Sequence, residues 1–296
     1  MTDVYQMVTD RILEHLSQGT IPWRCPWQMN SCGCISYSTG KPYSLLNQLL
    51  LGGRTGEYIT FNQAKASGGN VRKGEKSRFV VFWKLLEVKD KDTDEITIIP
   101  ILKYYNVFHI DQCKNINPRW RISEVDNTEP GNNLLPDDKA EQVILDYIDR
   151  SGVSFKPCRS DRAYYSPSTD TIVVPELSQY SEIGEYYSSA FHEIVHLTGA
   201  TKRLNRLSGD AAYQGYHETY SKEELVAEIG LAFLCNHCGV ETADSFRNST
   251  AYINGWVKAL RSDKRLIVSA AGKAEKAVNY ILGKEGTDDD AESREA

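Results

Sequence analysis

Residues 190–199 read Ala-Phe-His-Glu-Ile-Val-His-Leu-Thr-Gly. If this stretch is helical, His192 and His196 lie one turn apart on one face, where both imidazoles can bind the same Zn²⁺ ion. Glu193 stands between them, and its carboxylate can take a proton from a water molecule at the metal, which is the chemistry of the H-E-x-x-H motif. The apolar and aromatic neighbours predict a buried helix, and Gly199 predicts its end just after the second histidine.

A second, acidic helix is predicted over residues 221–234. It carries Glu224 and Glu228 in an otherwise apolar segment, and their spacing places both carboxylates on one face. A glutamate from this helix would be the third ligand that a His₂Glu site requires. Glu228 is the preferred ligand, because Ser221-x-x-Glu224 is also a capping-box pattern that would direct Glu224 to the start of its own helix. The opposite order, with Glu224 on the metal and Glu228 behind a histidine, stays open.

Charge is distributed unevenly along the 296-residue chain. The formal net charge is −6, but residues 1–120 hold 15 basic and 11 acidic residues, whereas the remaining residues hold 19 and 29. A polyanionic partner would therefore meet the N-terminal part. The length and the 41% of hydrophobic residues suffice for two domains.

The composition indicates a cytoplasmic protein with no membrane partner. The N-terminus does not resemble a signal peptide, and no apolar run approaches the roughly 20 residues of a transmembrane span. Seven cysteines, an odd number, fit reduced thiols better than a disulfide framework. The clusters Cys25, Cys32, Cys34 and Cys235–Cys238 lack a matching second pair for structural zinc, so we interpret these cysteines as small apolar side chains.

The front of the chain predicts an α+β domain over residues 1–118, followed by a proline-rich, polar linker over residues 119–136. Apolar residues recur every four positions in the first helix, which Thr2 or Asp3 would cap. A charged hairpin tip at residues 89–95 would join the first two β-rich runs. The expected elements are helices at 4–16 and 45–51, a turn at 39–43, a basic glycine-rich loop at 68–76, and strands at 79–88, 96–102 and 104–108.

The back of the chain predicts a mainly helical domain with a small β-sheet over residues 137–283, and an acidic disordered tail over 284–296. A β-hairpin is expected at 163–175, and its second strand, Thr171–Val174, precedes the metal-binding helix. Such a strand either borders a cleft and pairs with an extended peptide or serves as sheet scaffold. The expected helices lie at 137–150, 181–197, 221–238, 244–260 and 272–282.

The whole chain, from about residue 5 to about residue 282, resembles the ArdC-type antirestriction proteins carried by mobile elements. In the front half the similarity lies in residues 19–27 (Gly-Thr-Ile-Pro-Trp-Arg-Cys-Pro-Trp), 39–43, 60–65, 69–76 and 105–108. In the back half it lies in residues 165–170, 192–199, 203–206 and 223–228.

This resemblance implies a single-stranded-DNA-binding N-terminal domain fused to a zincin-like metallopeptidase domain, which together shield incoming DNA from host restriction. It also implies Zn²⁺ at the histidines, with Mn²⁺ or another divalent metal as the alternative. Two features depart from the family pattern. The family usually has Asn where His109 stands, and its N-terminal loop lacks Cys32-Gly-Cys34, so no role is carried over to these residues.

The residue types of the front half also support binding of single-stranded DNA. Non-specific binders combine a cationic groove for the backbone with aromatic platforms on which bases stack. The basic residues of the glycine-rich loop are the strongest candidates, because charged side chains there have little reason to pack in a core. The candidate stacking residues are Trp23, Trp27, Tyr43, Phe61 and Trp83, and the candidate phosphate contacts are Arg24, Lys41, Lys65, Arg72, Lys73, Lys76 and Arg78.

The working hypothesis is a cytoplasmic antirestriction protein that binds single-stranded DNA and uses Glu193 as the general base of a peptidase-like site. Tyr216, His217 or Tyr220, between the two ligand helices, are candidates to stabilise an oxyanion. Two alternatives remain open. The protein could be a zinc protease acting on DNA-bound proteins, or a DNA-binding module whose metal is structural or regulatory and supports no catalysis.

Overall fold

The N-terminal part of the molecule is built around a four-stranded sheet. The computed structural model of the protein describes residues 3–18, 20–24, 33–52, 54–89, 96–120, 136–207, 218–240 and 249–284. The sheet has the strand order β1-β2-β5-β4 and consists of β1 (Cys34–Ser36), β2 (Gly56–Thr60), β4 (Arg78–Lys89) and β5 (Ile96–His109). β1 and β2 are parallel, and the other neighbours are antiparallel.

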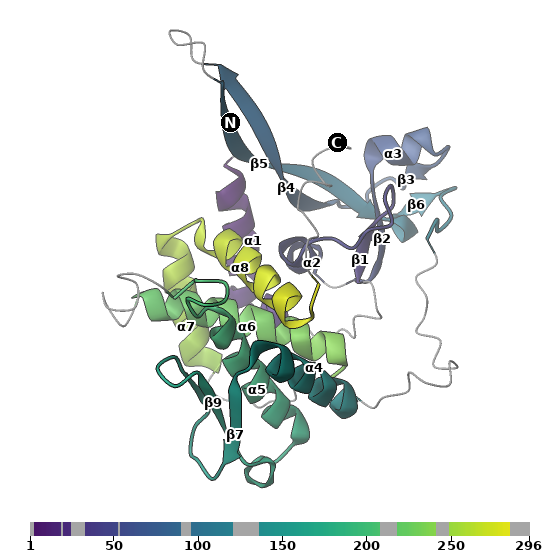
Figure 1. The fold of residues 1–296 in the computed structure, drawn as a ribbon. Coiled ribbons are helices and arrows are strands. Elements are labelled where there is room, and N and C mark those ends of the chain that lie inside the picture. The colour runs from purple at the N-terminus through teal and green to yellow at the C-terminus, as the bar shows by residue number, and fades with distance from the viewer. Residues whose placement is uncertain are drawn as a thin grey trace.

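β5 is one continuous strand where the sequence predicted two. It pairs with β4 along its length, from Ile96 opposite Lys89 to Val107 opposite Arg78. The prediction was wrong because Lys103, between the two apolar runs, keeps the strand periodicity and introduces no turn. The expected β4–β5 hairpin is confirmed, while residues 90–95 of its tip lie outside the described residues. The two strands extend beyond the rest of the sheet as a long ribbon (Figure 1).

Short elements cover and flank this sheet, and their starts follow capping rules. The carboxylate of Asp3 accepts a hydrogen bond from Gln6 N at the start of the first helix, and Thr60 and Gln63 form a capping box at the start of the third. The elements are α1 (Val4–Ser17), η1 (Pro22–Arg24), α2 (Leu45–Leu51), α3 (Phe61–Ala66), η2 (Ile110–Gln112) and the paired strands β3 (Asn70–Val71) and β6 (Cys113–Lys114).

The C-terminal part is mainly helical, with a small sheet at one side (Figure 1). No helix in the described ranges is long and apolar enough to span a bilayer. The helices are α4 (Pro136–Ser151), α5 (Ile183–Thr198), α6 (Glu218–Cys238), α7 (Ser249–Ser262) and α8 (Leu266–Ile281), and the turn η3 (Leu177–Gln179) precedes α5. The sheet consists of β7 (Ser154–Cys158), β8 (Tyr164–Ser166) and β9 (Thr171–Pro175).

β9 is the central strand of this sheet, whose order is β7-β9-β8. It pairs in parallel with β7 and antiparallel with β8. Of the two roles considered for residues 171–174, sheet scaffold is therefore correct and the cleft edge is wrong, because β7, which the sequence analysis missed, occupies the second side of the strand. β8 is the outer strand on the hairpin side.

The two parts share one hydrophobic core. Its buried side chains include Val8 and Ile12 of α1, Leu49 of α2, Phe191 of α5 and Ile267 of α8. Polar contacts join the same elements: Thr9 Oγ1 donates to Lys264 O over 2.9 Å, and Leu45 N donates to Glu275 Oε1 over 3.1 Å. The architecture is thus α+β with two parts that pack against each other through α1, α2, α7 and α8.

Most of the expected linker and tail lies outside the described residues, which resume at 136 and end at 284. Arg119 and Trp120, which fall in the linker predicted over residues 119–136, are described. Their backbone amides donate to the carboxylate of Glu57, and Trp120 Nε1 donates to Tyr37 O over 2.8 Å. These two residues therefore pack on the N-terminal sheet, because Glu57 and the ring of Trp120 anchor them there.

Candidate metal centre and nucleic-acid surface

Helix α5 presents two imidazoles on one face at the surface of an otherwise buried helix. The Nε2 atoms of His192 and His196 are 3.0 Å apart, and both side chains are only partly buried. Neighbouring Phe191, Ile194 and Val195 are fully buried and hold the helix against the core. The four-residue spacing therefore produces the convergence that the sequence predicted.

Glu224 of α6 completes a three-residue cluster with these histidines. Its carboxylate oxygens lie 3.4 Å from His192 Nε2 and 3.2 Å from His196 Nε2, and the three ligand atoms lie within 4.8 Å of one another. A tetrahedral ion with ligand distances of about 2.0–2.1 Å separates its ligand atoms by about 3.3 Å. The donor set and its spacing thus fit a divalent metal with an open fourth position.

Glu228 lies behind His192, 3.8 Å from Nδ1, on the side away from Nε2. The geometry therefore favours Glu224 as the third ligand and does not support the preference for Glu228. The physical reason is that α6 begins at Glu218, so Ser221 lies inside the helix and is not its N-cap. Glu224 is consequently free of the capping role that the sequence pattern suggested.

Glu223, which the sequence analysis did not assign, occupies the equivalent place behind His196. Its Oε1 lies 3.7 Å from His196 Nδ1 and accepts a hydrogen bond of 2.7 Å from Arg206 Nη2. Arg206 also donates to Val195 O and to Thr198 Oγ1. Each imidazole therefore has a carboxylate at Nδ1, an arrangement that orients histidine ligands in metal sites. The adjacent pair Glu223-Glu224 was visible in the sequence, but only the position of Arg206 reveals the role of Glu223.

Negative charge accumulates around these imidazoles. Burial disfavours the charged form of Glu224, but hydrogen bonds with His192 and His196 outweigh it and hold the pKa of Glu224 well below its usual range. Burial likewise opposes the charge on His196, and the carboxylates of Glu223 and Glu224 reverse that effect and raise its pKa. A cluster of this composition favours a bound cation.

Glu193 is buried next to the cluster, and this burial raises the pKa of its carboxyl group. The carboxylate accepts a hydrogen bond from the backbone N–H of Tyr165 in β8. This contact ties the candidate general base to the outer strand of the sheet. Of the candidate oxyanion stabilisers, Tyr216 and His217 lie outside the described residues, as does the side chain of Tyr220.

A second charged cluster fixes the turn between β8 and β9. Asp170 accepts hydrogen bonds from Arg203 Nη1 at 2.8 Å, Lys202 Nζ at 2.5 Å and Tyr165 Oη at 2.9 Å. Burial would raise the pKa of Asp170, but these donors outweigh it and hold the pKa well below its usual range. No local sequence pattern indicates this role, because the partners of Asp170 come from both sides of α5. Their contact joins β8, which supports Glu193, to the segment after α5.

Trp23, a predicted stacking residue, is in the core. Only 2% of its surface is exposed, and its ring packs edge-on against Trp256 of α7 with centroids 5.2 Å apart. The expectation that it stacks on bases is therefore wrong, because the 3₁₀ turn η1 directs its ring toward the helices. The side chain of Arg24 and all of Trp27 lie outside the described residues.

Lys41 and Tyr43 border a groove of about 450 Å³ on the N-terminal sheet. The groove also contains Phe82 and Tyr105, whose rings are stacked with centroids 4.5 Å apart and nearly parallel planes. Phe61 lies at the same groove with 45% of its surface exposed. Lys65 Nζ lies 4.9 Å from the centroid of the Phe61 ring. Exposed rings and cations thus meet around one concavity.

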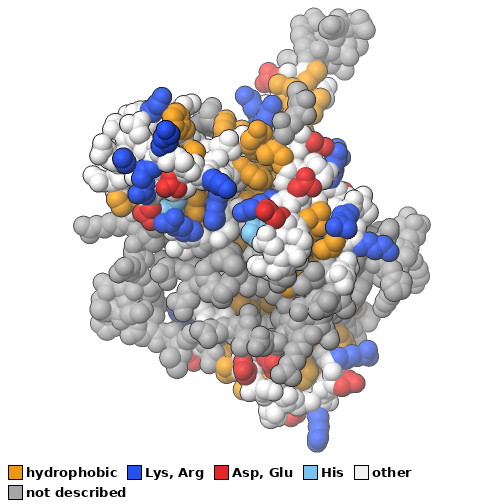
Figure 2. Space-filling model, turned by 180° about the vertical axis from the view of Figure 1, so that it is seen from behind, with side chains coloured by type: hydrophobic (Ala, Val, Ile, Leu, Met, Phe, Trp, Pro, Cys, Tyr) orange, Lys and Arg blue, Asp and Glu red, His pale blue; other side chains and the backbone are white. Residues whose placement is uncertain are grey.

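Arg72, Lys73 and Lys76 are exposed in the loop around β3, as expected. Arg72 Nε lies 3.6 Å from Glu75 Oε1, a contact of little energetic weight between exposed groups. Figure 2 views the molecule from behind Figure 1 and shows Lys and Arg side chains gathered at the upper left, over the part that holds α3, β3 and β6. Trp83, another candidate, is 41% exposed and makes an edge contact with Tyr5.

His109 and Cys34 have structural roles. His109 Nδ1 accepts from Asp111 N and so caps η2, and Nε2 faces Thr55 O at 3.0 Å. An Asn at this position could cap the same turn, which accounts for the departure from the family pattern. Cys34 is buried with its thiol directed at Arg54 O, whereas Cys25 and Cys32 lie outside the described residues. Among the residues that the structure describes, the His192, His196 and Glu224 cluster is the one with metal-site spacing.

Two family models match the chain. Residues 2–108 match the N-terminal domain of anti-restriction factor ArdC, and residues 141–273 match a zincin-like metallopeptidase domain. The antirestriction protein ArdC from plasmid R388 has a crystal structure in its metal-free form that superposes on this chain with a TM-score of 0.74. The two sequences are 34% identical, and the match covers 96% of this chain and 98% of the ArdC chain. Its Mn(II)-bound form is 33% identical, covers 97% and 100% of the two chains, and has the same TM-score.

Curated relatives include longer proteins. DNA primase TraC of Escherichia coli is 34% identical over 94% of this chain, which spans 27% of that primase. A second TraC primase of the same species is 33% identical, and the chain spans 20% of it. Protein y4eC of Sinorhizobium fredii is 28% identical over 95% of this chain and 92% of its own length. The similarity thus covers nearly the whole chain, both in proteins of similar length and in a minor part of much longer ones.

Proposed function

This chain belongs to the family of ArdC antirestriction proteins, and from that premise we propose that it binds single-stranded DNA non-specifically and uses a divalent-metal site in protecting incoming DNA from restriction. The observation that carries the proposal is the joint presence, on one core, of an aromatic and cationic groove and a His₂Glu cluster. Each half of the proposal has its own structural support.

The DNA-binding half rests on the groove of the N-terminal sheet. Phe61 and Tyr105 expose aromatic faces, on which bases of any identity can stack. Lys41 lines the groove and Lys65 lies beside Phe61, so cations accompany the rings as a sugar-phosphate backbone requires. Arg72, Lys73 and Lys76 extend the cationic surface into the loop around β3. Tyr43 borders the groove, whereas Trp23 is buried and has no face on which a base could stack.

The metal half rests on the three converging ligand atoms. His192, His196 and Glu224 would hold the ion, while Glu228 and Glu223 hold the two imidazoles in orientation. The donor set of two nitrogens and one carboxylate is that of catalytic zinc sites, so Zn²⁺ is the proposed ion, with Mn²⁺ as the alternative that the Mn(II)-bound ArdC structure suggests. A bound divalent ion would supply Lewis-acid polarisation of a peptide carbonyl.

The chain's own residues would supply the remaining chemistry. Glu193 is poised to accept a proton, because its buried carboxylate is held in place by the backbone of Tyr165. β8 has one unpaired side within the described sheet, and an extended peptide could add to that edge beside the cluster. A substrate that combines both halves would be a protein bound to DNA, which is the protease alternative.

A second candidate function is that the metal tunes DNA binding without catalysis. The observation that favours it is the shared core, because α5 and α6 carry the ligands and pack in the same cluster as α1 and α2 of the N-terminal part. Ordering of the ligand helices by a metal would then stabilise the DNA-binding surface. The position of Glu193 beside the ligands favours the catalytic reading.

The test compares the full chain with Glu193→Gln in two assays. One measures hydrolysis of a protease-sensitive protein with and without single-stranded DNA, and the other measures survival of unmodified plasmid DNA that enters a restricting host. Loss of both activities in the variant supports catalysis as the protective function. Equal protection by the two proteins, with no hydrolysis by either, supports the regulatory reading, whereas retained protection with lost hydrolysis shows that catalysis and protection are separate. Absence of protection by the unaltered chain would overturn the antirestriction proposal.

A further inference from the structure

A strongly basic pocket lies beside β4, away from the metal cluster and with different lining residues from the aromatic groove. It encloses about 410 Å³, and the described residues that line it include four Lys and Arg but no Asp or Glu. The cations come from distant parts of the sequence: Arg11 from α1, Arg54 from the segment before β2, and Lys76 and Arg78 from the loop and strand that follow β3. Such a convergence concentrates positive potential in one concavity.

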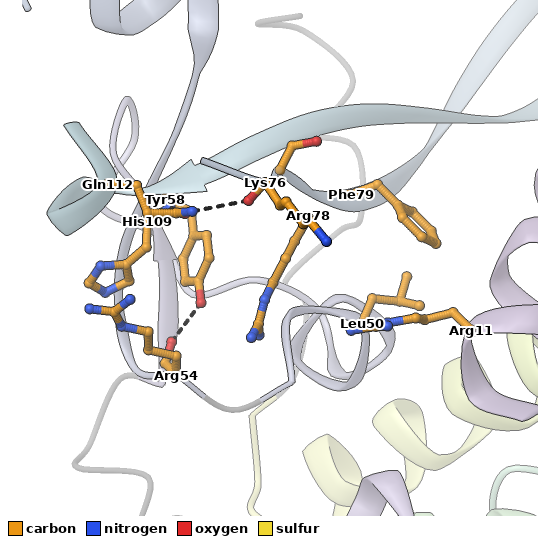
Figure 3. A pocket seen from close by; sticks show the side chains of 10 residues that line it. Arg11, Leu50, Arg54, Tyr58, Lys76, Arg78, Phe79, His109 and Gln112 are labelled. Carbon is orange, nitrogen blue, oxygen red and sulfur yellow. Dashed lines mark hydrogen bonds between the residues drawn. The ribbon is translucent and has the colours of Figure 1, made fainter. Parts of the chain in front are cut away.

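Arg78 is the central cation of this pocket. In Figure 3 its side chain extends from β4 into the space between Tyr58 and Leu50. Its Nη1 atom is buried and has no hydrogen-bond partner among the residues that the structure describes. Arg78 Nη1 can occupy this position because Gly52 has no side chain. A Cβ atom at position 52 would lie 2.9 Å from this nitrogen. A buried guanidinium N–H without an acceptor is costly, and an anion in the pocket that Arg78 lines would offset part of that cost through its charge.

The other cations are available to share that ligand. Lys76 has no carboxylate partner for its ammonium group in the part of the chain that the structure describes, and its backbone carbonyl accepts from Gln112. Arg11 and Arg54 pair with Glu14 and Asp111, but these ion pairs are solvent-exposed and therefore weak. A ligand that brings two negative charges can replace such pairs at small cost.

Neutral groups fix the pocket wall. Tyr58 Oη donates to Arg54 O over 2.8 Å, as Figure 3 shows, and this bond anchors the segment that carries Arg54. His109 is held by Asp111 N and Thr55 O, and burial lowers the pKa of its imidazole, so it adds shape without charge near neutral pH. The positive potential of the pocket therefore comes from Lys and Arg side chains alone and persists across the physiological pH range.

We propose that this pocket binds a dianionic phosphate group, the form found at the phosphorylated end of a DNA strand and in free inorganic phosphate. A terminal phosphate presents three oxygens and two charges, which match several convergent guanidinium and ammonium donors, whereas an internal phosphodiester carries one charge and must continue in both directions. The strand-end form rests on the proposed DNA binding and deepens it, because a protein that recognises strand ends would load onto DNA at a terminus. The free-phosphate form is independent of that proposal.

The first experiment titrates inorganic phosphate into the full chain by calorimetry at constant ionic strength, with sulfate as a second probe. Phosphate binding is expected, and Lys76→Gln should weaken it about tenfold, with a larger loss in Arg78→Gln. The matched control is Lys273→Gln with Lys276→Gln on α8, which removes exposed charge far from the pocket in sequence. Because Lys76 is exposed, its variant should keep the fold even if Arg78→Gln does not. Equal affinity in Lys76→Gln and the control, or no phosphate binding, would overturn the proposal.

The second experiment separates the two phosphate sources. The full chain is titrated with one oligonucleotide in a 5′-phosphorylated and a 5′-hydroxyl form, and with a 3′-phosphorylated form. A preference for a phosphorylated end of about tenfold, lost in Lys76→Gln and retained in the control, identifies the strand terminus as the ligand. Equal binding of all forms, together with phosphate binding in the first experiment, identifies a free-anion site. Failure of every oligonucleotide to bind would refute the DNA-binding proposal. The titration with inorganic phosphate would then show by itself whether the pocket binds a phosphate group.

Discussion

The carboxylate of Glu224 lies 3.2 Å from Nε2 of His196, so a residue of α6 reaches the same point as the imidazoles of α5. Glu228, one turn further along α6, reaches Nδ1 of His192 instead. Two glutamates at i and i+4 on one helix thus contact the imidazole pair at different nitrogens, Glu224 at the Nε2 atoms and Glu228 at one Nδ1 atom.

This relationship predicts different costs for two matched substitutions. Glu224→Gln should lower the affinity for Zn²⁺ by more than about 100-fold because it removes a ligand oxygen with its charge, whereas Glu228→Gln should lower it by about tenfold because only imidazole orientation is disturbed. Competition with a chromophoric chelator measures both affinities. A greater loss in Glu228→Gln than in Glu224→Gln would reverse the ligand assignment.

Glu223 predicts a similar orienting effect on His196. Its carboxylate sits between His196 Nδ1 and Arg206 Nη2, so Glu223→Gln should lower metal affinity by about 10- to 100-fold while the helical circular dichroism stays unchanged. Glu182→Gln, an exposed change at the start of α5, is the matched control and should leave metal affinity as it is. Equal affinities for the two variants would show that Glu223 has no part in the site.

The exposed ring of Phe61 predicts a loss of DNA affinity on truncation. Phe61→Ala should weaken single-stranded DNA binding about tenfold, because stacking contributes roughly 1–3 kcal/mol per base, while thermal stability changes little. Fluorescence anisotropy with a labelled oligonucleotide measures the affinity. Tyr164→Ala, which removes a comparably exposed ring from the C-terminal part, should have no effect. If both variants bind as the unaltered chain does, the groove is not the stacking surface.

The burial of Trp23 predicts that its truncation lowers stability and leaves DNA affinity almost unchanged, which is the opposite of the effect expected for Phe61. The ring of Trp23 is buried against Trp256, so Trp23→Ala should lower the free energy of unfolding by about 3–5 kcal/mol. DNA affinity, measured below the unfolding temperature, should stay close to that of the unaltered chain. Because the cores of the two parts are continuous, the unfolding transitions of the N-terminal and C-terminal parts should fall together. Trp23→Phe, which keeps most of the ring volume, should recover part of the stability.

Asp170 predicts a pH-dependent contribution to stability. Its pKa is depressed in the folded state, so the unfolded chain binds more protons on acidification. The contribution is present above the unfolded pKa of about 3.9 and is lost as pH falls through the folded pKa. Asp170→Asn should cost about 3 kcal/mol at neutral pH, because Arg203 is left buried without its counter-charge.

The measurement for this prediction is urea unfolding at a series of pH values. The difference between the unaltered chain and Asp170→Asn should shrink as pH falls below about 4. Asn also tolerates the left-handed backbone conformation of this position, where φ is 48°, so backbone strain does not confuse the comparison. A stability difference that is independent of pH would show that the loss arises from packing and not from charge.

The sequence by itself determined the features that depend on residues within a few positions of one another. Four-residue spacing placed His192 and His196 on one face, because helix geometry requires no knowledge of the rest of the fold. The sequence likewise limited the cap of α1 to Thr2 or Asp3, of which the structure has Asp3. The groups of motifs in both halves likewise indicated the family, which the matches over residues 2–108 and 141–273 and the solved ArdC structures confirmed.

Only the tertiary structure decided which side chains meet across elements. The choice of Glu224 over Glu228 depended on where α6 begins and how it crosses α5, and the burial of Trp23 depended on a ring in α7 more than 200 residues away. The basic pocket brings Arg11, Arg54 and Arg78 together from separate elements. Local patterns cannot encode such meetings, because burial and convergence are set by packing between segments that are distant in sequence.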